Sequence, residues 1–323
     1  MLVLSEVVVR YGSTRAVDRV DLTLEAGECL ALVGPSGCGK SSLLRAVAGL
    51  EPLAGGTVML DGRRIDSVAP DQRPIGLMFQ DHALFEHRDV AGNVAFGLRM
   101  QRWEAARQRQ RVAELLELVG LAGYGSRAIA TLSGGEAQRV ALARTLAPGP
   151  RVVLLDEPLG SLDRSLRERL IDELPEVLAA TRTAAIHVTH DQDEAFALGD
   201  RIGVMVDGRL LQVGPPAEVW ARPVSLEVAD VLGHRNVVKV DGRPEVWRSD
   251  AATFTVATDD AAVGQAGADR WVTVERVVFR GVAAEVWVRT DEGQQLRFLL
   301  RQEPPTVGDR VGLVIDPERI IRL

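Results

Sequence analysis

Hydrophobic and polar positions follow two different patterns along this chain of 323 residues. In residues 2–9, Leu2 and Leu4 and then Val7 and Val9 stand two positions apart, a spacing that is typical of a half-buried strand. Residues 29–33, 152–155 and 202–206 are instead continuously apolar, as in strands that are buried on both faces. Because segments with helical patterns lie between these runs, we expect an α/β fold with a largely parallel sheet and helices on its faces.

Alternation returns in the last part of the chain, beyond residue 236. The runs there are WVTVERVVF, AEVWVRT and QQLRFLL, and turn sequences such as DEG separate them. This pattern predicts a small all-β barrel of the OB type over residues 234–323. Residues 1–233 form the larger α/β domain, in which residues from about 81 to 147 are mostly helical in pattern and predict a helical subdomain.

Composition narrows the class of protein. Hydrophobic residues make up 46% and charged residues 26%, as in a globular chain, and the net charge of −7 argues against general nucleic-acid binding. The only two cysteines, Cys29 and Cys38, suggest a reduced compartment rather than a disulfide framework. No basic leader and no apolar run near the roughly 20 residues of a spanning helix occurs. We therefore expect a soluble chain that is able to dock on a membrane protein.

The sequence GPSGCGKS follows the apolar run 29–33 and precedes a helical pattern, as a phosphate-binding loop requires. Its backbone N–H groups are expected to surround the α and β phosphates of a nucleotide. Lys40 would reach the β and γ phosphates, and Ser41 would bind Mg²⁺. The residues expected to bind the nucleotide here are Gly34, Pro35, Ser36, Gly37, Cys38, Gly39, Lys40, Ser41 and Ser42.

Two carboxylates follow the apolar run 152–155, in the sequence VVLLDEP. Ligands bind at the carboxyl ends of strands in sheets of this kind. Asp156 would hold Mg²⁺, commonly through water, and Glu157 would orient or deprotonate the attacking water. An Asp-Glu pair alone often marks an ordinary surface loop. Together with the phosphate-binding loop, it predicts hydrolysis of a nucleoside triphosphate.

A second glycine turn, LSGGEAQRVALAR, begins at residue 132 and has no lysine. Glu136 stands three residues after Ser133, which predicts a capping box at the start of a helix. The N-terminus of a helix offers free N–H groups and positive potential to an anion. Two phosphate-binding turns in one chain therefore need an explanation.

LSGGEAQRVALAR together with VVLLDEP resembles the nucleotide-binding subunit of ATP-binding-cassette (ABC) transporters, and the resemblance covers the whole chain. It implies a P-loop ABC ATPase domain, with a mixed sheet and a helical subdomain, followed by a TOBE-type barrel. It also implies that Tyr11 stacks on adenine, that Gln80 senses Mg²⁺ and the attacking water, and that His190 touches the γ phosphate. Asp163 matches the D-loop. Alone, each of these residues would have an ordinary structural explanation. For His187 we expect a structural role only.

The resemblance also implies a head-to-tail homodimer with two ATP molecules. The signature residues Ser133, Gly134, Gly135 and Glu136 of one chain would cap the γ phosphate held by the partner's phosphate-binding loop. The second turn would therefore need no lysine of its own. Two positions depart from the family pattern, Glu136 instead of glutamine and Gly160 in the D-loop. They would change the rate of ATP hydrolysis and leave the assignment as an ATPase intact.

The barrel after the ATPase domain resembles the regulatory domain of bacterial importers. This implies an ATPase subunit that drives solute uptake through separate membrane permease subunits, at the cytoplasmic face of the membrane. An extracellular solute-binding protein would act indirectly, and the solute would be an inorganic ion such as iron, a polyamine or thiamine. Leu84, Phe85 and Phe96 would face the permease or simply form the core of the helical subdomain.

The alternative is a soluble ABC ATPase that acts on DNA or ribosomes and has no part in transport. The DNA-repair type needs a long coiled-coil insertion, and the ribosome-acting type usually fuses two cassettes. The sequence contains neither feature, so the importer subunit is the preferred interpretation.

Overall fold

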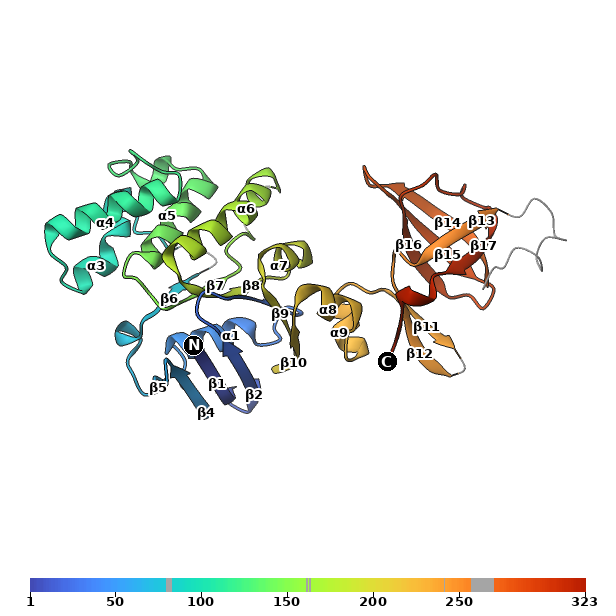
Figure 1. Cartoon of the computed structure of the whole chain (residues 1–323), viewed down its shortest axis with the longest axis horizontal. Coiled ribbons are helices and arrows are strands. Elements are labelled where there is room, and N and C mark those ends of the chain that lie inside the picture. Colours follow the sequence, from blue (N-terminus) through green and yellow to red (C-terminus); the bar gives the residue numbers. More distant parts are fainter. Residues whose placement is uncertain (80–82, 161, 163, 241, 257–269) are drawn as a thin grey trace. The chain divides into compact units, whose positions relative to one another are not determined.

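The computed structural model describes residues 1–79, 83–160, 162, 164–240, 242–256 and 270–323 (Figure 1). Two compact units make up the chain, Met1–Pro216 and Ala217–Leu323. The predicted boundary between residues 233 and 234 stays a prediction, and each unit is described by itself below.

A six-stranded sheet lies at the centre of the first unit in the described part of the chain. Its strands are, in spatial order, β10 (Arg209–Gly214), β9 (Arg201–Val206), β3 (Cys29–Val33), β8 (Ala184–Val188), β7 (Val152–Asp156) and β6 (Ile75–Met78). All neighbouring pairs are parallel except β10 with β9. Every residue of β3, β7 and β8 is buried, which explains their unbroken apolar sequences.

A smaller antiparallel sheet packs against one face of this unit. Its strands are β2 (Thr14–Leu24), β1 (Leu2–Tyr11), β4 (Gly55–Leu60) and β5 (Arg63–Arg64), and the 3₁₀ helix η1 (Pro70–Gln72) follows. Helix α1 (Lys40–Ala48) lies between the two sheets, because its Leu43 and Leu44 share one hydrophobic core with Leu4 of β1 and Leu154 of β7. The mixed α/β architecture confirms the predicted fold of this unit.

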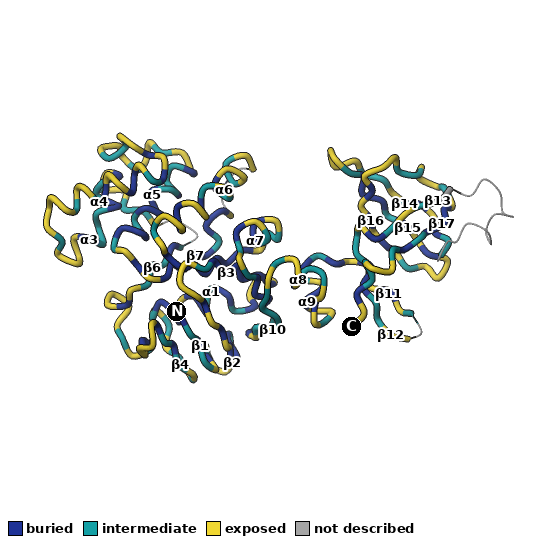
Figure 2. Tube along the Cα trace, in the orientation of Figure 1, coloured by how far each residue is buried: buried dark blue, intermediate teal, exposed yellow. Residues whose placement is uncertain are grey.

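A layer of helices covers the other face of the central sheet (Figure 1). Its elements are α2 (Val90–Val94), α3 (Phe96–Met100), α4 (Ala105–Leu118), η2 (Ile129–Thr131), α5 (Gly134–Leu146), α6 (Arg164–Thr181) and α7 (Gln192–Leu198). Val153 and Leu155 of β7 belong to the core of this layer, whereas Val152 and Leu154 belong to the core around α1. Helices α1 and α5 therefore pack on opposite faces of β7. Figure 2 shows β3 and β7 as largely buried and much of α4 as exposed.

The second unit begins with two short helices, α8 (Pro216–Ala221) and α9 (Leu226–Val231), and continues in antiparallel sheets. The smaller sheet contains β11 (Asn236–Val240), β12 (Arg243–Trp247) and β18 (Ile320–Arg322), which follows the 3₁₀ helix η4 (Pro317–Arg319). The larger sheet has the order β13 (Ala252–Val256), β17 (Arg310–Ile315), β14 (Arg270–Phe279), β15 (Ala284–Thr290) and β16 (Gln295–Leu300).

The larger sheet of the second unit curls, because its edge strands β13 and β16 come into contact. Val286, Phe298 and Leu313 fill the interior of the curl and are fully buried. This arrangement confirms the predicted barrel-like all-β domain. None of the helices in the described residues is long and apolar enough to cross a membrane.

Candidate active site

Two glycines fix the backbone of the phosphate-binding loop between β3 and α1. Gly34 has φ 159°, and a Cβ atom there would lie 2.0 Å from the carbonyl oxygen of Met205. Gly39 has φ 105°, and its Cβ would lie 2.0 Å from the carbonyl oxygen of Ala16. Side chains at these positions would collide with rigid backbone, so the loop requires glycine at both. Between them, Pro35, Ser36 and Gly37 form an exposed tip.

The ammonium group of Lys40 lies inside this loop. Its Nζ donates hydrogen bonds to the carbonyl oxygens of Gly34 at 2.7 Å and Pro35 at 3.0 Å, and it lies 3.7 Å from the Sγ atom of Cys38. The lysine is only 6% exposed. Because it also opens helix α1, its charge adds to the positive potential of the helix N-terminus. The loop thus offers a concentrated positive charge to phosphate oxygens.

Ser41 and Asp156 meet beside the loop, at the carboxyl end of β7. The Ser41 hydroxyl donates to Oδ1 of Asp156 at 2.8 Å. Burial raises the pKa of the Asp156 carboxyl, while the Ser41 hydrogen bond and the charges of Arg45 and Lys40 oppose that shift. A hydroxyl and a carboxylate oxygen are ligands that suit Mg²⁺, which keeps several waters and takes its other ligands from phosphates. In the described residues no cluster of three or more histidine, cysteine, aspartate or glutamate side chains offers another metal site.

Glu157 adopts a left-handed backbone conformation, with φ 47°. Its N–H donates to the carbonyl oxygen of Val188 at 3.0 Å, so the neighbouring strand β8 holds the turn. Backbone strain of this kind costs on the order of 1–3 kcal/mol in a residue other than glycine and is common at functional sites. The turn brings Oε2 of Glu157 to 3.4 Å from Nδ1 of His190, which follows the end of β8 and stays exposed.

A buried carboxylate supports the segment that carries His190. Oε1 of Glu194 lies 2.5 Å from Nε2 of His187, and Oε2 accepts a hydrogen bond from the Thr189 hydroxyl at 3.0 Å. All three side chains are buried. His187 therefore has a structural partner, whereas His190 faces outward beside Glu157.

The signature turn has the predicted capping box. The Glu136 N–H donates to the Ser133 hydroxyl at 3.3 Å, and the Ser133 N–H donates to Oε2 of Glu136 at 2.7 Å. The Ser133 N–H and the Tyr124 hydroxyl lower the pKa of the Glu136 carboxyl, and Arg127 lies 4.0 Å away. Ser133 and Gly134 are exposed at this end of α5, so their backbone is accessible to a partner.

Gly135 has a packing function that the sequence did not reveal. A Cβ atom there would lie 2.2 Å from Cδ2 of Leu166 in α6. At Gly134 the nearest atom outside the local backbone, in Leu162, is 3.8 Å away. Gly135 therefore lets α5 and α6 approach each other, while a Cβ atom at Gly134 would make only an ordinary van der Waals contact.

The structure brings together only some of the predicted site residues. Lys40, Ser41 and Asp156 form one group, and Glu157 and His190 form the adjacent one. Tyr11 ends strand β1 with a side chain that is 44% exposed. Residues Ser133 to Glu136 stand on the helix that packs on the opposite face of β7 from α1. Ser42 is half-buried in α1, and Gln80 and Asp163 lie outside the described residues.

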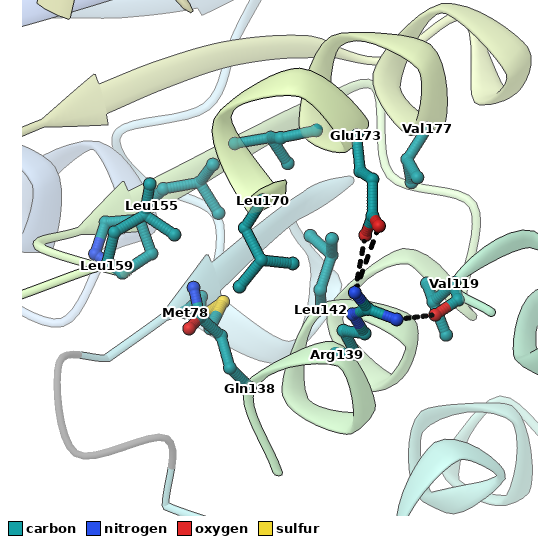
Figure 3. Close-up of a pocket in the computed structure, with 12 residues that line it drawn as sticks. Met78, Val119, Gln138, Arg139, Leu142, Leu155, Leu159, Leu170, Glu173 and Val177 are labelled. Carbon is teal, nitrogen blue, oxygen red and sulfur yellow. Dashed lines mark hydrogen bonds and ion pairs between the residues drawn. The ribbon is translucent and has the colours of Figure 1, made fainter. Parts of the chain in front are cut away.

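A small cavity of about 30 Å³ lies between α5, α6 and β7 (Figure 3). Arg139 borders it, donating to Glu173 and to the carbonyl oxygen of Val119. The side-chain oxygen of Gln138 is buried and has no hydrogen-bond partner among the described residues. Apolar residues of β6, β7, the signature helix α5, the segment after Glu157 and α6 also line it, among them Met78, Leu155, Leu142, Leu159 and Leu170.

Comparison with known proteins agrees with this geometry. The family model described as "ABC transporter" matches residues 17–160, and the model of the TOBE domain matches residues 243–323. The chain is 47% identical to the Fe(3+) ions import ATP-binding protein FbpC of Streptomyces avermitilis, over 100% of this chain and 98% of that protein. It is 37% identical to the spermidine/putrescine import ATP-binding protein PotA of Mesorhizobium japonicum, over 96% and 93% respectively.

Solved structures show the same fold. One is a dimeric post-hydrolysis state of the ATP-binding cassette MJ0796 bound to ADP and phosphate, with a TM-score of 0.59 and 28% identity. The match covers 67% of this chain and 99% of that chain. Another is cbiO1 from Clostridium perfringens, with a TM-score of 0.63 and 29% identity over 68% of this chain and 90% of that one.

The fold and the site define an ABC ATPase with a C-terminal TOBE domain. The chain belongs to the family of import ATP-binding proteins of ABC transporters, whose members bind and hydrolyse ATP. The family resemblance that the sequence motifs indicated is confirmed. The alternative of an ABC ATPase without a part in transport is not supported.

Proposed function

We propose that this protein hydrolyses Mg-ATP in a shared site of a homodimer and thereby drives the import of Fe(3+) through separate permease subunits. The phosphate-binding loop is the nucleotide-binding element. The hydrogen bonds that the Lys40 ammonium donates to the neutral carbonyls of Gly34 and Pro35 exchange readily for stronger contacts with phosphate oxygens, in which both partners are charged. Tyr11, with its exposed ring at the end of β1, stacks on the adenine.

Ser41 and Asp156 hold Mg²⁺, with Gln80 as a further ligand. The bound ion supplies positive charge to the phosphate oxygens. Glu157 orients the attacking water and accepts its proton, and His190 contacts the γ phosphate. The 3.4 Å distance between Glu157 and His190 supports this assignment, because it lets the imidazole stabilise the carboxylate beside the reacting atoms.

The signature residues act on the partner's nucleotide. Helices α1 and α5 pack on opposite faces of β7, and each presents its own N-terminus. The exposed turn at Ser133 and Gly134 therefore caps the phosphate held by a second copy of the chain, with Gly135 and Glu136 adjoining. We also assign Asp163, on its sequence motif, to this shared site. Similarity to a dimeric ABC structure supports this arrangement.

A groove between α2 and α4 is the proposed docking site for a permease helix. Its volume is about 540 Å³. Small residues line much of it, among them Ala91, Ala95, Ala105, Ala113, Gly123 and Gly125. Such residues allow the backbone of a partner helix to approach closely. Docking there places the protein at the cytoplasmic face of the membrane, and an external solute-binding protein acts only through the permease.

The aromatic residues expected to face the permease lie beside this groove's helix α2. Phe85 and Phe96 stack with their ring centres 4.6 Å apart, and Arg88 and Arg144 lie over the Phe85 ring. Leu84 packs against the helical core. We propose that these side chains support the docking segment, and that the small residues make the direct contacts.

Sequence identity to import proteins over the full length of the chain is the observation that supports Fe(3+) as the solute. Two Fe(3+) import proteins are 47% and 48% identical to this chain over both of its units, whereas a PotA relative is 37% identical over its length. A deletion strain should lose most of its uptake of radiolabelled Fe(3+) under iron limitation. Uptake should return with the intact gene and not with Glu157→Gln. Normal Fe(3+) uptake with impaired uptake of spermidine or sulfate would assign a different solute.

A further inference from the structure

One arginine connects the two chain segments that carry Glu157 and His190. Arg167 lies in the first turn of α6, and its side chain is 30% exposed. Nη1 donates to Oδ2 of Asp191 at 3.2 Å, and Nη2 donates to the carbonyl oxygen of Leu162 at 3.3 Å. Asp191 follows His190 directly, and Leu162 lies in the segment that leads from Glu157 to α6.

Asp191 is itself held in place from several directions. Its Oδ1 accepts the N–H of Glu194 at 3.2 Å and caps helix α7, and its own N–H donates to the Thr189 hydroxyl at 3.0 Å. Thr189 in turn bonds to the buried Glu194. His190 therefore lies between Thr189 and Asp191, whose side chains are both held by hydrogen bonds. Arg167 connects Asp191 to α6.

From the turn that begins at Glu157, hydrogen bonds among the described residues lead back to the same arginine. The Gly160 N–H donates to the carbonyl oxygen of Glu157 at 3.2 Å, and the Leu162 N–H donates to that of Leu159 at 3.3 Å. Arg167 binds the carbonyl at the end of this turn. The contacts thus form a closed ring, from Glu157 through Leu162, Arg167 and Asp191 to His190 and back to Glu157.

The shape of the side chain suits this bridging position. A guanidinium group presents several donors in a rigid plane, so it reaches a carboxylate and a carbonyl at once, whereas a lysine has one nitrogen on a flexible stem. Arg164, one turn earlier on the same helix, pairs with Glu168 at 2.8 Å and is 92% exposed. Solvent-exposed pairs of that kind contribute little.

We propose that Arg167 is a positioning residue for ATP hydrolysis: it holds the Glu157 turn and the His190 segment at a fixed separation. Arg167 itself does not touch the nucleotide. Its loss slows the chemical step, because misplacing a catalytic group by a small distance lowers the rate steeply. ATP binding is unaffected, since Lys40 and Ser41 have their own supports. The inference rests on the function proposed above for Glu157 and His190.

A double-mutant cycle on the purified full chain tests the proposal. Arg167→Gln should lower the kcat of Mg-ATP hydrolysis about tenfold and change KM less than about twofold. Asp191→Asn keeps the cap of α7 but weakens the bond to Arg167, so it should lower kcat similarly. The double variant should be no slower than either single variant, because both remove the same contact. Arg164→Gln, the matched control, should behave as the wild type.

Arg167→Lys provides a second measurement, and it should recover only part of the lost kcat. The inference would be overturned if the reductions of kcat in Arg167→Gln and Asp191→Asn multiplied in the double variant. A change in KM or in the melting temperature without a loss of kcat would overturn it as well. If Arg167→Gln does not fold, the same comparison with Arg167→Lys decides. Glu157→Gln distinguishes a failure of the proposed function from a failure of the role of Arg167. Normal turnover of Glu157→Gln would refute the proposed function. Lost turnover of Glu157→Gln together with normal turnover of Arg167→Gln would refute only the role of Arg167.

Discussion

Individual residues in this site owe their positions to backbone geometry more than to their own side-chain contacts. Glu157 reaches His190 because its backbone is left-handed, and Lys40 lies within the loop because Gly34 and Gly39 let the loop pass close to other carbonyls. The type of each residue was predictable from VVLLDEP and GPSGCGKS. The conformation of Glu157 was not, since nothing in the local sequence requires a positive φ there.

At this scale we expect Glu157→Gln to bind ATP but to hydrolyse it at least about a hundredfold more slowly, because the amide cannot accept a proton. Loss of the negative charge at residue 157 also removes its repulsion of the γ phosphate, so bound Mg-ATP should keep the dimer closed. Phosphate release and size-exclusion chromatography with Mg-ATP measure the two effects. Glu168→Gln, on an exposed surface of α6, serves as the control. Undiminished phosphate release would remove Glu157 from the mechanism.

At the scale of elements, the contact between α5 and α6 gives different roles to Gly134 and Gly135, which look equivalent in the signature sequence. Predicting that Gly135 packs against Leu166 would require knowing which helix crosses α5 there. Sequence alone located the start of α5 through its capping box, which depends on residues three apart. Contacts such as Arg167 with Asp191 join residues that are far apart in sequence, so spacing could not predict them.

Gly135→Ala should therefore destabilise the protein by about 1–3 kcal/mol, as overpacking does, while Gly134→Ala should have a much smaller effect. Thermal unfolding of the two variants gives the comparison. Leu166→Ala should relieve part of the Gly135→Ala defect, because it removes the atoms that a new Cβ would meet. Equal melting temperatures for the two glycine variants would contradict this packing function.

In the second unit, His234 links helix α8 to the strands. Its ring packs on Trp220, with the ring centres 4.2 Å apart, and its Nε2 lies 3.0 Å from the Trp220 carbonyl oxygen. Burial lowers the pKa of His234, although the Trp220 carbonyl opposes the shift. The unfolded chain then binds the proton more readily, so the unit should lose stability as the pH falls below about 6.5.

Melting curves between pH 7.5 and 5.5 (about the range in which histidine titrates) test this effect. The melting temperature of the wild type should fall more steeply with decreasing pH than that of His234→Gln. Titration of all other groups is common to both proteins and cancels in the comparison. Parallel curves would show that His234 carries no such effect.

At the scale of the whole molecule, the functional question is which chain each signature turn serves. The general architecture followed from the sequence, because apolar runs and alternating runs differ so clearly between the two parts of the chain. Pairing of two copies was available only through the family resemblance. The structure adds that α1 and α5 pack on opposite faces of β7.

Mixed dimers distinguish the two possibilities. One chain carries Lys40→Ala and the other Gly134→Asp, and both carry Glu157→Gln to prevent hydrolysis. Gly134 is the suitable position, since it is exposed, a Cβ atom there would make only a van der Waals contact with Leu162, and the substitution spares the α5–α6 contact. Each variant alone should retain no ATP after rapid desalting. The mixture should retain up to one ATP per heterodimer, because one site then combines an intact loop with an intact signature turn.

Heterodimers should first be isolated with two different affinity tags, so that a negative result is meaningful. No retained ATP in verified heterodimers would mean that each signature turn serves its own chain. As the control, a chain with Lys40→Ala is paired with an otherwise unsubstituted chain, again with Glu157→Gln in both, and this heterodimer should also retain one ATP.

Strand β7, which carries Asp156 and Glu157 at its end, is buried along its whole length and paired on both sides, with β6 and β8. Its amide hydrogens should therefore exchange with deuterium only when the first unit opens as a whole. Amides in the exposed parts of the helical layer should exchange through smaller openings. Local fluctuations of that layer should therefore leave in alignment Asp156 and Glu157, to which the binding of Mg²⁺ and the orientation of the attacking water are assigned in the proposed function.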